Sequence, residues 1–190
     1  DGKVADITGS PFTNPDLLNP GTHSMVIYNR AEGFTFDGRM ARVNAPDGKS
    51  RADGASVIPL PDYLKTVSQE ITVTADDTLR VNPVPQQRVR DLQLELEVTQ
   101  GRPELIQSVT ATLSGIAGIF DMEKGQTIGE PTSTVFSFTR DGSKLTADAR
   151  LLGTMGDVQA LVLDIVFTDG GRTQRTEVDL TEALADFNGD

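Results

Sequence analysis

Two stretches of apolar patterning constrain the fold of this chain more than any other feature of its sequence. Asp157–Phe167 (DVQALVLDIVF) is a nearly unbroken apolar run that is followed by the glycine-rich turn TDGG. Asp91–Thr99 (DLQLELEVT) alternates apolar and polar residues without interruption. Alternation with a period of two indicates a half-buried strand, and a short apolar run between turns suits a strand buried on both faces. Both stretches predict an all-β protein.

Further strand signals recur along the chain, separated by turn residues. Asp37-Gly38-Arg39 predicts one hairpin turn and Asp76-Asp77 another, whereas 44–56 is a long polar loop. Only 103–107 and 181–186 indicate a turn of helix. Strands spaced roughly ten residues apart are typical of an antiparallel β-sandwich. The predicted strands are 22–29, 34–36, 40–43, 70–75, 78–81, 88–99, 108–114, 116–120, 134–140, 145–151, 158–167 and 172–180.

Charge and cysteine content exclude several classes of function. The 190 residues carry a net charge of −11, which argues against nucleic-acid binding because phosphate contacts need clustered Lys and Arg. The chain has no cysteine, so disulfides, thiolate metal sites and a cysteine nucleophile are excluded. No stretch reaches the roughly 18 apolar residues that span a bilayer. The opening DGKVADITGS is not a signal peptide, and we expect any export signal to lie upstream of it.

Two prolines suggest where the chain divides. Pro83 and Pro85 interrupt strand pairing, because proline cannot donate to a sheet ladder. We therefore predict a domain boundary near 83–90, with one domain over 1–87 and a second over 88–190.

The single histidine gives little support for catalysis. A catalytic histidine needs a nucleophile beside it and a carboxylate to orient it. His23 is next to Ser24 in a predicted strand, and adjacent strand residues point to opposite faces. The interpretation favoured by the sequence is an exposed or hydrogen-bonded strand histidine, and one histidine without cysteine also argues against the usual zinc sites.

Carboxylate pairs occur in several places. Glu95 and Glu97 share one strand face about 7 Å apart, a spacing reminiscent of glycosidase carboxylates, but Gln93 and Thr99 extend the same polar face and favour a solvated surface. Asp76/Asp77 is a second pair. The ending DFNGD (186–190) contains a fragment of a calcium-loop pattern without its downstream glutamate, and it equally suits a plain coil.

No nucleotide-binding or hydrolase motif is present in the sequence, and no cofactor is expected. Gly115–Gly118 is glycine-rich but is followed by neither a Lys-Ser/Thr pair nor a helix, so a turn between strands is the better interpretation. Sugar-binding modules usually stack sugars on aromatic rings. The chain has no Trp and only Tyr28 and Tyr63, which weakens a carbohydrate-binding interpretation without removing it.

Several segments resemble the fimbrillin-type surface lipoproteins of Bacteroidetes, a family of fimbrial shaft, anchor and tip subunits. The resemblance covers most of the chain from about Leu18, in the family's order of segments. It departs from the family in lacking the lipobox cysteine, and no leading strand of the first domain is evident before Leu17 unless Lys3–Ile7 supplies it. The similar segments are 18–22 (LNPGT), 25–29 (MVIYN), 89–98, 108–119 (SVTATLSGIAGI), 136–138, 145–152 and 175–184 (RTEVDLTEAL).

This resemblance implies two transthyretin-like β-sandwich domains in tandem and a non-enzymatic fimbrial or adhesion-associated subunit. The family implies that an N-terminal strand can be removed and its groove filled by a strand of a neighbouring subunit. The implied partners are other fimbrial subunits or host surface and glycan ligands. The implied location is the outer membrane surface, through a lipid anchor upstream of this chain. We expect Asp157–Phe167 to be the central strand of the second sandwich, paired with Arg172–Leu180.

The strand-accepting groove would border Phe34 and Phe36 or the 158–167 sheet. The alternatives are a carbohydrate-binding module of a polysaccharide-utilisation system and an accessory domain of a glycoside hydrolase that uses Glu95 and Glu97.

Overall fold

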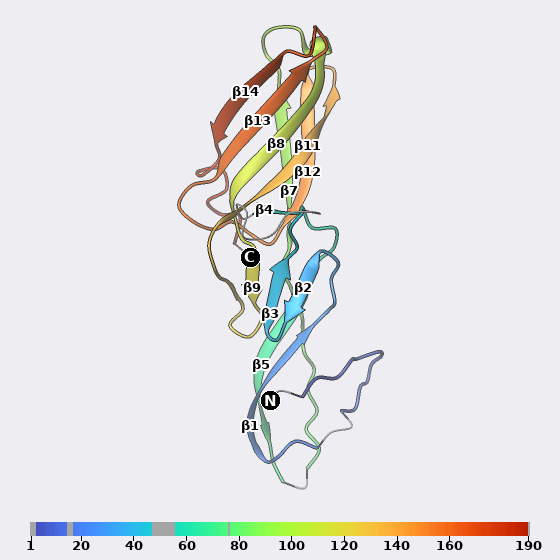
Figure 1. Cartoon of the computed structure of the whole chain (residues 1–190). Coiled ribbons are helices and arrows are strands. Elements are labelled where there is room, and N and C mark those ends of the chain that lie inside the picture. Colours follow the sequence, from blue (N-terminus) through green and yellow to red (C-terminus); the bar gives the residue numbers. More distant parts are fainter. Residues whose placement is uncertain (1–2, 15–16, 47–55, 76, 190) are drawn as a thin grey trace.

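The protein is an elongated, all-β molecule with a larger upper part and a smaller lower part (Figure 1). The computed structural model describes residues 3–14, 17–46, 56–75 and 77–189. The elements are β1 (Gly21–Tyr28), β2 (Phe34–Asp37), β3 (Met40–Val43), β4 (Ser56–Val57), β5 (Lys65–Val73), β6 (Gln86–Gln87), β7 (Arg90–Glu97), a 3₁₀ turn (Pro103–Leu105), β8 (Ile106–Ile116), β9 (Ile119–Asp121), β10 (Gln126–Thr127), β11 (Thr132–Asp141), β12 (Lys144–Leu151), β13 (Ala160–Phe167) and β14 (Thr173–Asp179).

The upper part is a sandwich made from one continuous path of strands, β14-β13-β8-β11-β12-β7. Strand β11 pairs with β8 over Ser133–Phe138 and then with β12 over Thr139–Asp141. It therefore passes from one layer to the other and joins the two sheets. The resulting layers lie one in front of the other in Figure 1.

Alternation along each strand fills the core of this sandwich. On β8, Val109, Ala111 and Leu113 are almost completely buried, whereas the residues between them are half-buried or exposed. On β12 the same period of two buries Leu145, Ala147, Ala149 and Leu151. Because successive side chains of a strand point to opposite faces, this pattern places one apolar face of each sheet against the other.

The apolar run predicted at 157–167 forms β13 over Ala160–Phe167, and its predicted pairing with 172–180 is confirmed by the β13–β14 ladder. Two other expectations for this strand are wrong. It is next to the edge of its sheet rather than central, because only β14 lies beyond it. It is also not buried on both faces, since Leu161 and Leu163 face the core while Asp164 is exposed and Val162 is half-buried.

The lower part contains two smaller sheets, β1-β5-β6 and β10-β9-β3-β2. Tyr28 of β1 stacks on Phe36 of β2 with ring centroids 4.9 Å apart. At the other side, Arg88 donates from Nε to Thr66 Oγ1 at 3.0 Å and lies over the Phe120 ring. These contacts join the two sheets face to face.

Strand pairing crosses the predicted domain boundary. Pro83 and Pro85 lie in an irregular stretch between β5 and β6. However, β3 pairs with β9, and β4 pairs in parallel with β11 at the base of the upper sandwich. The division into 1–87 and 88–190 therefore stays a prediction.

One predicted hairpin is wrong. Strand β5 runs over Lys65–Val73 and pairs with β1 along its full length. Thr78–Val81 is not a strand, and the other edge of β5 pairs instead with the short strand β6 at Lys65 and Thr66. Asp76, from the predicted turn, and most of the predicted polar loop 44–56 lie outside the described residues. Within the described part of the chain, no helix is long and apolar enough to cross a membrane.

We predict that Leu113→Ala lowers the free energy of unfolding by about 3 kcal/mol, because Leu113 is fully buried at the centre of β8 and its truncation leaves a cavity. Val135→Ala, on the neighbouring strand but 42% exposed, is the matched control and should cost less than about 1 kcal/mol. Urea unfolding followed by circular dichroism measures both. Equal losses for the two variants would contradict the assigned core.

Candidate functional site

The edge strands of the molecule differ in how they are protected. A sheet edge exposes unpaired backbone groups, and proteins commonly protect such edges with charged side chains. Strand β1 is an edge strand of eight residues, GTHSMVIY, and contains no Lys, Arg, Asp or Glu. The two long edge strands of the upper sandwich carry Arg175, Glu177 and Asp179 on β14 and Arg90, Asp91, Glu95 and Glu97 on β7.

The pairing register shows which backbone groups of β1 face outward. Just beyond the strand, the N–H of Asn29 donates to the carbonyl of Lys65 at 3.3 Å. Bonded and non-bonded pairs alternate in an antiparallel ladder, so the odd-numbered residues of β1 face β5. Thr22, Ser24, Val26 and Tyr28 therefore direct their N–H and C=O groups toward the outer edge. Among the described residues, no backbone hydrogen bond joins that edge to another segment.

The upper half of β1 is apolar on both of its faces. Val26 and Tyr28 point inward and pack against the core, and Tyr28 stacks on Phe36. Met25 and Ile27, on the opposite face, are half-buried. An added strand would thus meet apolar side chains above and below its own backbone along this half of the edge.

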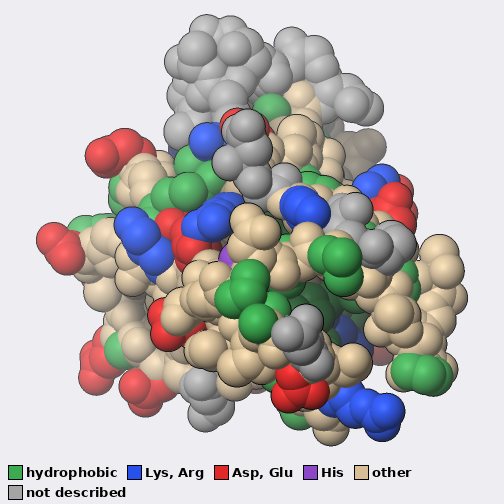
Figure 2. Space-filling model, turned by 90° about the horizontal axis from the view of Figure 1, so that it is seen from below, with side chains coloured by type: hydrophobic (Ala, Val, Ile, Leu, Met, Phe, Trp, Pro, Cys, Tyr) green, Lys and Arg blue, Asp and Glu red, His purple; other side chains and the backbone are tan. Residues whose placement is uncertain are grey.

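Exposed apolar side chains occur at the lower end of the molecule. Where such side chains form a contiguous patch, they mark an interaction surface. Figure 2 views the molecule from its lower end and shows hydrophobic side chains reaching the surface there. Six of the eight large apolar side chains that are exposed in the described chain lie outside the strands, in 3–14, 17–20 and 77–85: Val4, Ile7, Phe12, Leu17, Leu79 and Val84.

The N-terminal segment does not complete the sheet. Lys3–Ile7 forms no strand, so it does not supply the leading strand considered above. Asp6 pairs with Arg30 at 2.8 Å, but both side chains are 72% exposed, and such pairs contribute little to stability. The Lys3 Nζ donates to the Leu17 carbonyl within the same segment.

The two groove positions suggested by the sequence, beside Phe34 and Phe36 or at the 158–167 sheet, differ in whether a strand can add there. Strand β13 is paired on both edges, with β14 and β8, so no further strand can add to it. Phe34 is buried and Phe36 contacts Tyr28, which places this aromatic pair beside β1. The absence of charge in 21–28 is the sequence signal that would have distinguished this edge.

The histidine and the paired carboxylates have structural partners. The His23 Nε2 lies 2.8 Å from the Asn19 carbonyl, while Ser24 donates to Glu123 at 2.9 Å, so the two neighbours turn to different partners. Glu95 accepts a hydrogen bond from Lys144 at 2.9 Å on an exposed face. This pairing agrees with a solvated, charged surface on β7 and β12.

Both tyrosines are already engaged. Tyr28 stacks on Phe36, and the Tyr63 hydroxyl donates to the Asp91 carboxylate at 2.8 Å. Arg150 covers the Tyr63 ring at 4.7 Å and also hydrogen-bonds the Pro61 carbonyl and Asp91. The pKa of Arg150 is raised above its ordinary value, mainly by its hydrogen bond with Tyr63. Each tyrosine ring thus has one face occupied by a neighbouring side chain of the protein.

The polar groups of the C-terminal acidic segment hydrogen-bond to the upper part of the molecule. The Asn188 side-chain amide accepts from the Thr154 N–H and donates to the Thr154 carbonyl, both at 2.9 Å. Arg90 donates to the Asn188 carbonyl at 2.7 Å. Asp190 is not among the described residues. In the part of the chain that is described, no group of three His, Asp or Glu side chains could hold a metal ion.

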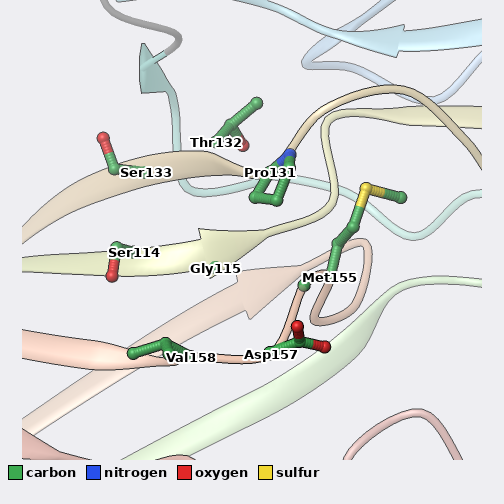
Figure 3. A pocket seen from close by; sticks show the side chains of 9 residues that line it. Ser114, Gly115, Pro131, Thr132, Ser133, Met155, Asp157 and Val158 are labelled. Atoms are coloured by element: carbon green, nitrogen blue, oxygen red, sulfur yellow. The ribbon is translucent and has the colours of Figure 1, made fainter.

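Two shallow hollows lie at the base of the upper sandwich. The first, of about 440 Å³, is bordered by Pro131, Met155, Asp157 and the end of β8 (Figure 3). Its Ser114 hydroxyl exchanges hydrogen bonds with Ala160, and Thr132 donates to the Ile116 carbonyl. The second hollow shares Met155–Asp157 and contacts the C-terminal segment. These hydroxyls serve the fold, and neither hollow assembles a catalytic group.

Comparison with known proteins supports the fold. No protein-family model matches the sequence, and no curated protein matches it. A candidate adhesin from Bacteroides ovatus superposes with a TM-score of 0.73 at 18% identity, over 88% of this chain and 68% of the other. The fimbrial anchor protein Mfa2 from Porphyromonas gingivalis superposes with a TM-score of 0.56 at 12% identity, over 92% of this chain and 65% of the other.

We predict that the amides of Val26 and Tyr28 exchange with solvent roughly tenfold faster than those of Met25 and Ile27, because only the latter donate to β5. Residue-resolved hydrogen exchange by NMR measures the difference. Uniform protection along β1 would contradict an open outer edge.

At these identities the likeness concerns the fold, and this chain spans about two thirds of the length of each of these proteins. The all-β architecture of this chain is similar to that of the Bacteroides ovatus candidate adhesin and of the Porphyromonas gingivalis fimbrial anchor protein.

Proposed function

We propose that this protein is a non-enzymatic, cell-surface fimbrial or adhesion-associated subunit that binds a partner through β-strand addition at the outer edge of β1. The observation that carries the proposal is a long, uncharged edge strand with outward backbone groups and apolar side chains on both sides. The fold shared with a candidate adhesin and a fimbrial anchor protein supports the same function.

Strand addition suits this edge physically. An incoming strand gains main-chain hydrogen bonds to the outward groups, while its side chains fill apolar sites. Four residues of β1, namely Thr22, Ser24, Val26 and Tyr28, offer those groups. Beside the last two, an uncharged and largely apolar strand is favoured, because a charged side chain would lose water there without gaining a partner.

The partners and location belong to the same proposal. Other fimbrial subunits supply the incoming strand, and host surface or glycan ligands are contacted elsewhere on the assembly. The protein is exported and held at the outer membrane by a lipid anchor upstream of Asp1. Residues 1–87 supply most of the strand-accepting domain, to which β9 and β10 are added, and the other strands of 88–190 form a second sandwich that supports it.

Removal of the N-terminal segment provides the direct test. The described residues 3–14 and 17–20 contribute no strand to either lower sheet, and 3–14 loop out beside the lower part of the molecule (Figure 1). We predict that a variant lacking residues 1–20 assembles in a concentration-dependent manner, as measured by size-exclusion chromatography with light scattering. Val26→Pro in that background removes one outward N–H and should reduce assembly at least about tenfold, because proline cannot donate to the added strand.

Val26→Ala is the matched control, since it shortens the same side chain but retains the N–H. Ile27→Pro shows the directionality of the edge, because it removes an N–H that faces β5 and should instead destabilise the fold. A truncated protein that stays monomeric at all concentrations would contradict assembly through this edge. Equal assembly of the Val26→Pro and Val26→Ala variants would also contradict it.

A further inference from the structure

A polar cluster of three residues joins β1 to the opposite sheet directly behind the open edge. The Ser24 hydroxyl of β1 donates to Glu123 Oε1 at 2.9 Å. The same carboxylate oxygen forms an ion pair with Arg39. Arg39 lies in the turn between β2 and β3, and Glu123 lies in the turn between β9 and β10. Three segments that are distant in the sequence therefore meet at one carboxylate.

The turn that carries Glu123 is held in place independently of Ser24. The buried Asp121 carboxylate accepts the N–H groups of Glu123 and Lys124, both at 3.0 Å. The fully buried Met122 anchors the turn and donates its N–H to the Arg39 carbonyl at 2.9 Å. These contacts fix the backbone of the turn beside β1. The turn that carries Glu123 is therefore ordered without the help of the hydrogen bond from Ser24.

The pairing register of β1 with β5 determines which groups of Ser24 take part in this contact. Ser24 is one of the even-numbered residues, so its backbone faces the outer edge while its side chain faces the opposite sheet. The cluster therefore holds β1 through the Ser24 side chain and does not use the outward N–H and C=O groups to which an added strand would bind. Four residues further along β1, the Tyr28–Phe36 stack makes the second contact between the two sheets. Between these two points the strand has one edge without backbone partners among the described residues.

We propose that Glu123, held by Arg39, is a positioning residue that fixes β1 through Ser24 and so presents the strand-docking edge. Without this contact, the half of β1 that includes Thr22 and Ser24 is held only by its ladder with β5, and a two-stranded ribbon by itself is marginally stable. The effect on strand docking rests on the proposed function, whereas the contact between Glu123, Arg39 and Ser24 does not.

The charge state of Glu123 makes the contact sensitive to acid. The hydrogen bonds from Arg39 and then Ser24 lower the pKa of Glu123 below its ordinary value of 4.5. A lowered pKa means that the stabilisation is present above pH 4.5 and is lost as the pH falls through the pKa of the folded protein. The other charged groups at this turn are Asp121, which opposes the shift, and Lys124, which pairs with Asp121.

Hydrogen exchange of the intact protein tests the contact without any docked strand. We expect Glu123→Gln and Ser24→Ala to raise the exchange rate of 21–25 about threefold at pH 7, the size expected when a partly exposed ion pair and one hydrogen bond are lost. Ser24→Thr keeps a hydroxyl and should restore protection. Glu95→Gln, which breaks the exposed pair with Lys144 on β7, is the matched control and should leave 21–25 unchanged.

The difference between wild type and Glu123→Gln should shrink as the pH falls through the lowered pKa of Glu123, because the wild-type carboxylate then becomes protonated. Exchange of 21–25 that is unaltered in Glu123→Gln, or raised equally in Glu95→Gln, would overturn the proposal. If exchange rises but the truncated protein never assembles, the positioning contact stands and the docking function fails. If the truncated protein assembles equally well with Glu123→Gln, the proposed influence of Glu123 on docking is wrong.

Discussion

The ladder between β1 and β5 is the interaction on which the candidate site depends, because it satisfies only one edge of β1. The pairs of this ladder turn the even-numbered residues outward and the odd-numbered residues toward β5. An edge of this length is a hazard unless something covers or repels incoming strands. The upper sandwich protects its own long edges with charge, whereas β1 does not. Among the three long edge strands β1, β7 and β14, only β1 therefore lacks charged side chains.

The two parts of the molecule contribute differently to this site. The upper sandwich has a continuous core in which β8 lies between β13 and β11 and is paired on both edges. The lower part has two smaller sheets and depends on side-chain contacts between them, such as Tyr28 on Phe36 and Ser24 on Glu123. Fewer buried contacts leave a segment with lower local stability, which is where binding regions are usually found. The upper sandwich supports the lower part, and the lower part contains β1 and its open edge.

Much of the fold follows from local pattern, and the site does not. Alternation predicted β7, other strand signals predicted β8, β11 and β12, and the turn residues predicted the β2–β3 hairpin and the β13–β14 pair. The hairpin predicted for Thr78–Val81 is wrong, and β5 instead pairs with β1, whose residues lie 38 to 52 positions earlier in the chain. Pairing over that distance leaves no mark in a short window of sequence. The same is true of Ser24 and Glu123, which are 99 residues apart. The resemblance to fimbrial subunits pointed to strand exchange, but the acceptor edge is assigned from register and charge.

The most direct measurement of the central claim compares hydrogen exchange of the assembled and monomeric forms of the truncated protein, resolved to single amides. If β1 accepts the incoming strand, the amides of Val26 and Tyr28 become protected on assembly, while those of Met25 and Ile27, already bonded to β5, change little. Protection that appears along β14 or β7, with Val26 and Tyr28 unchanged, would contradict the account.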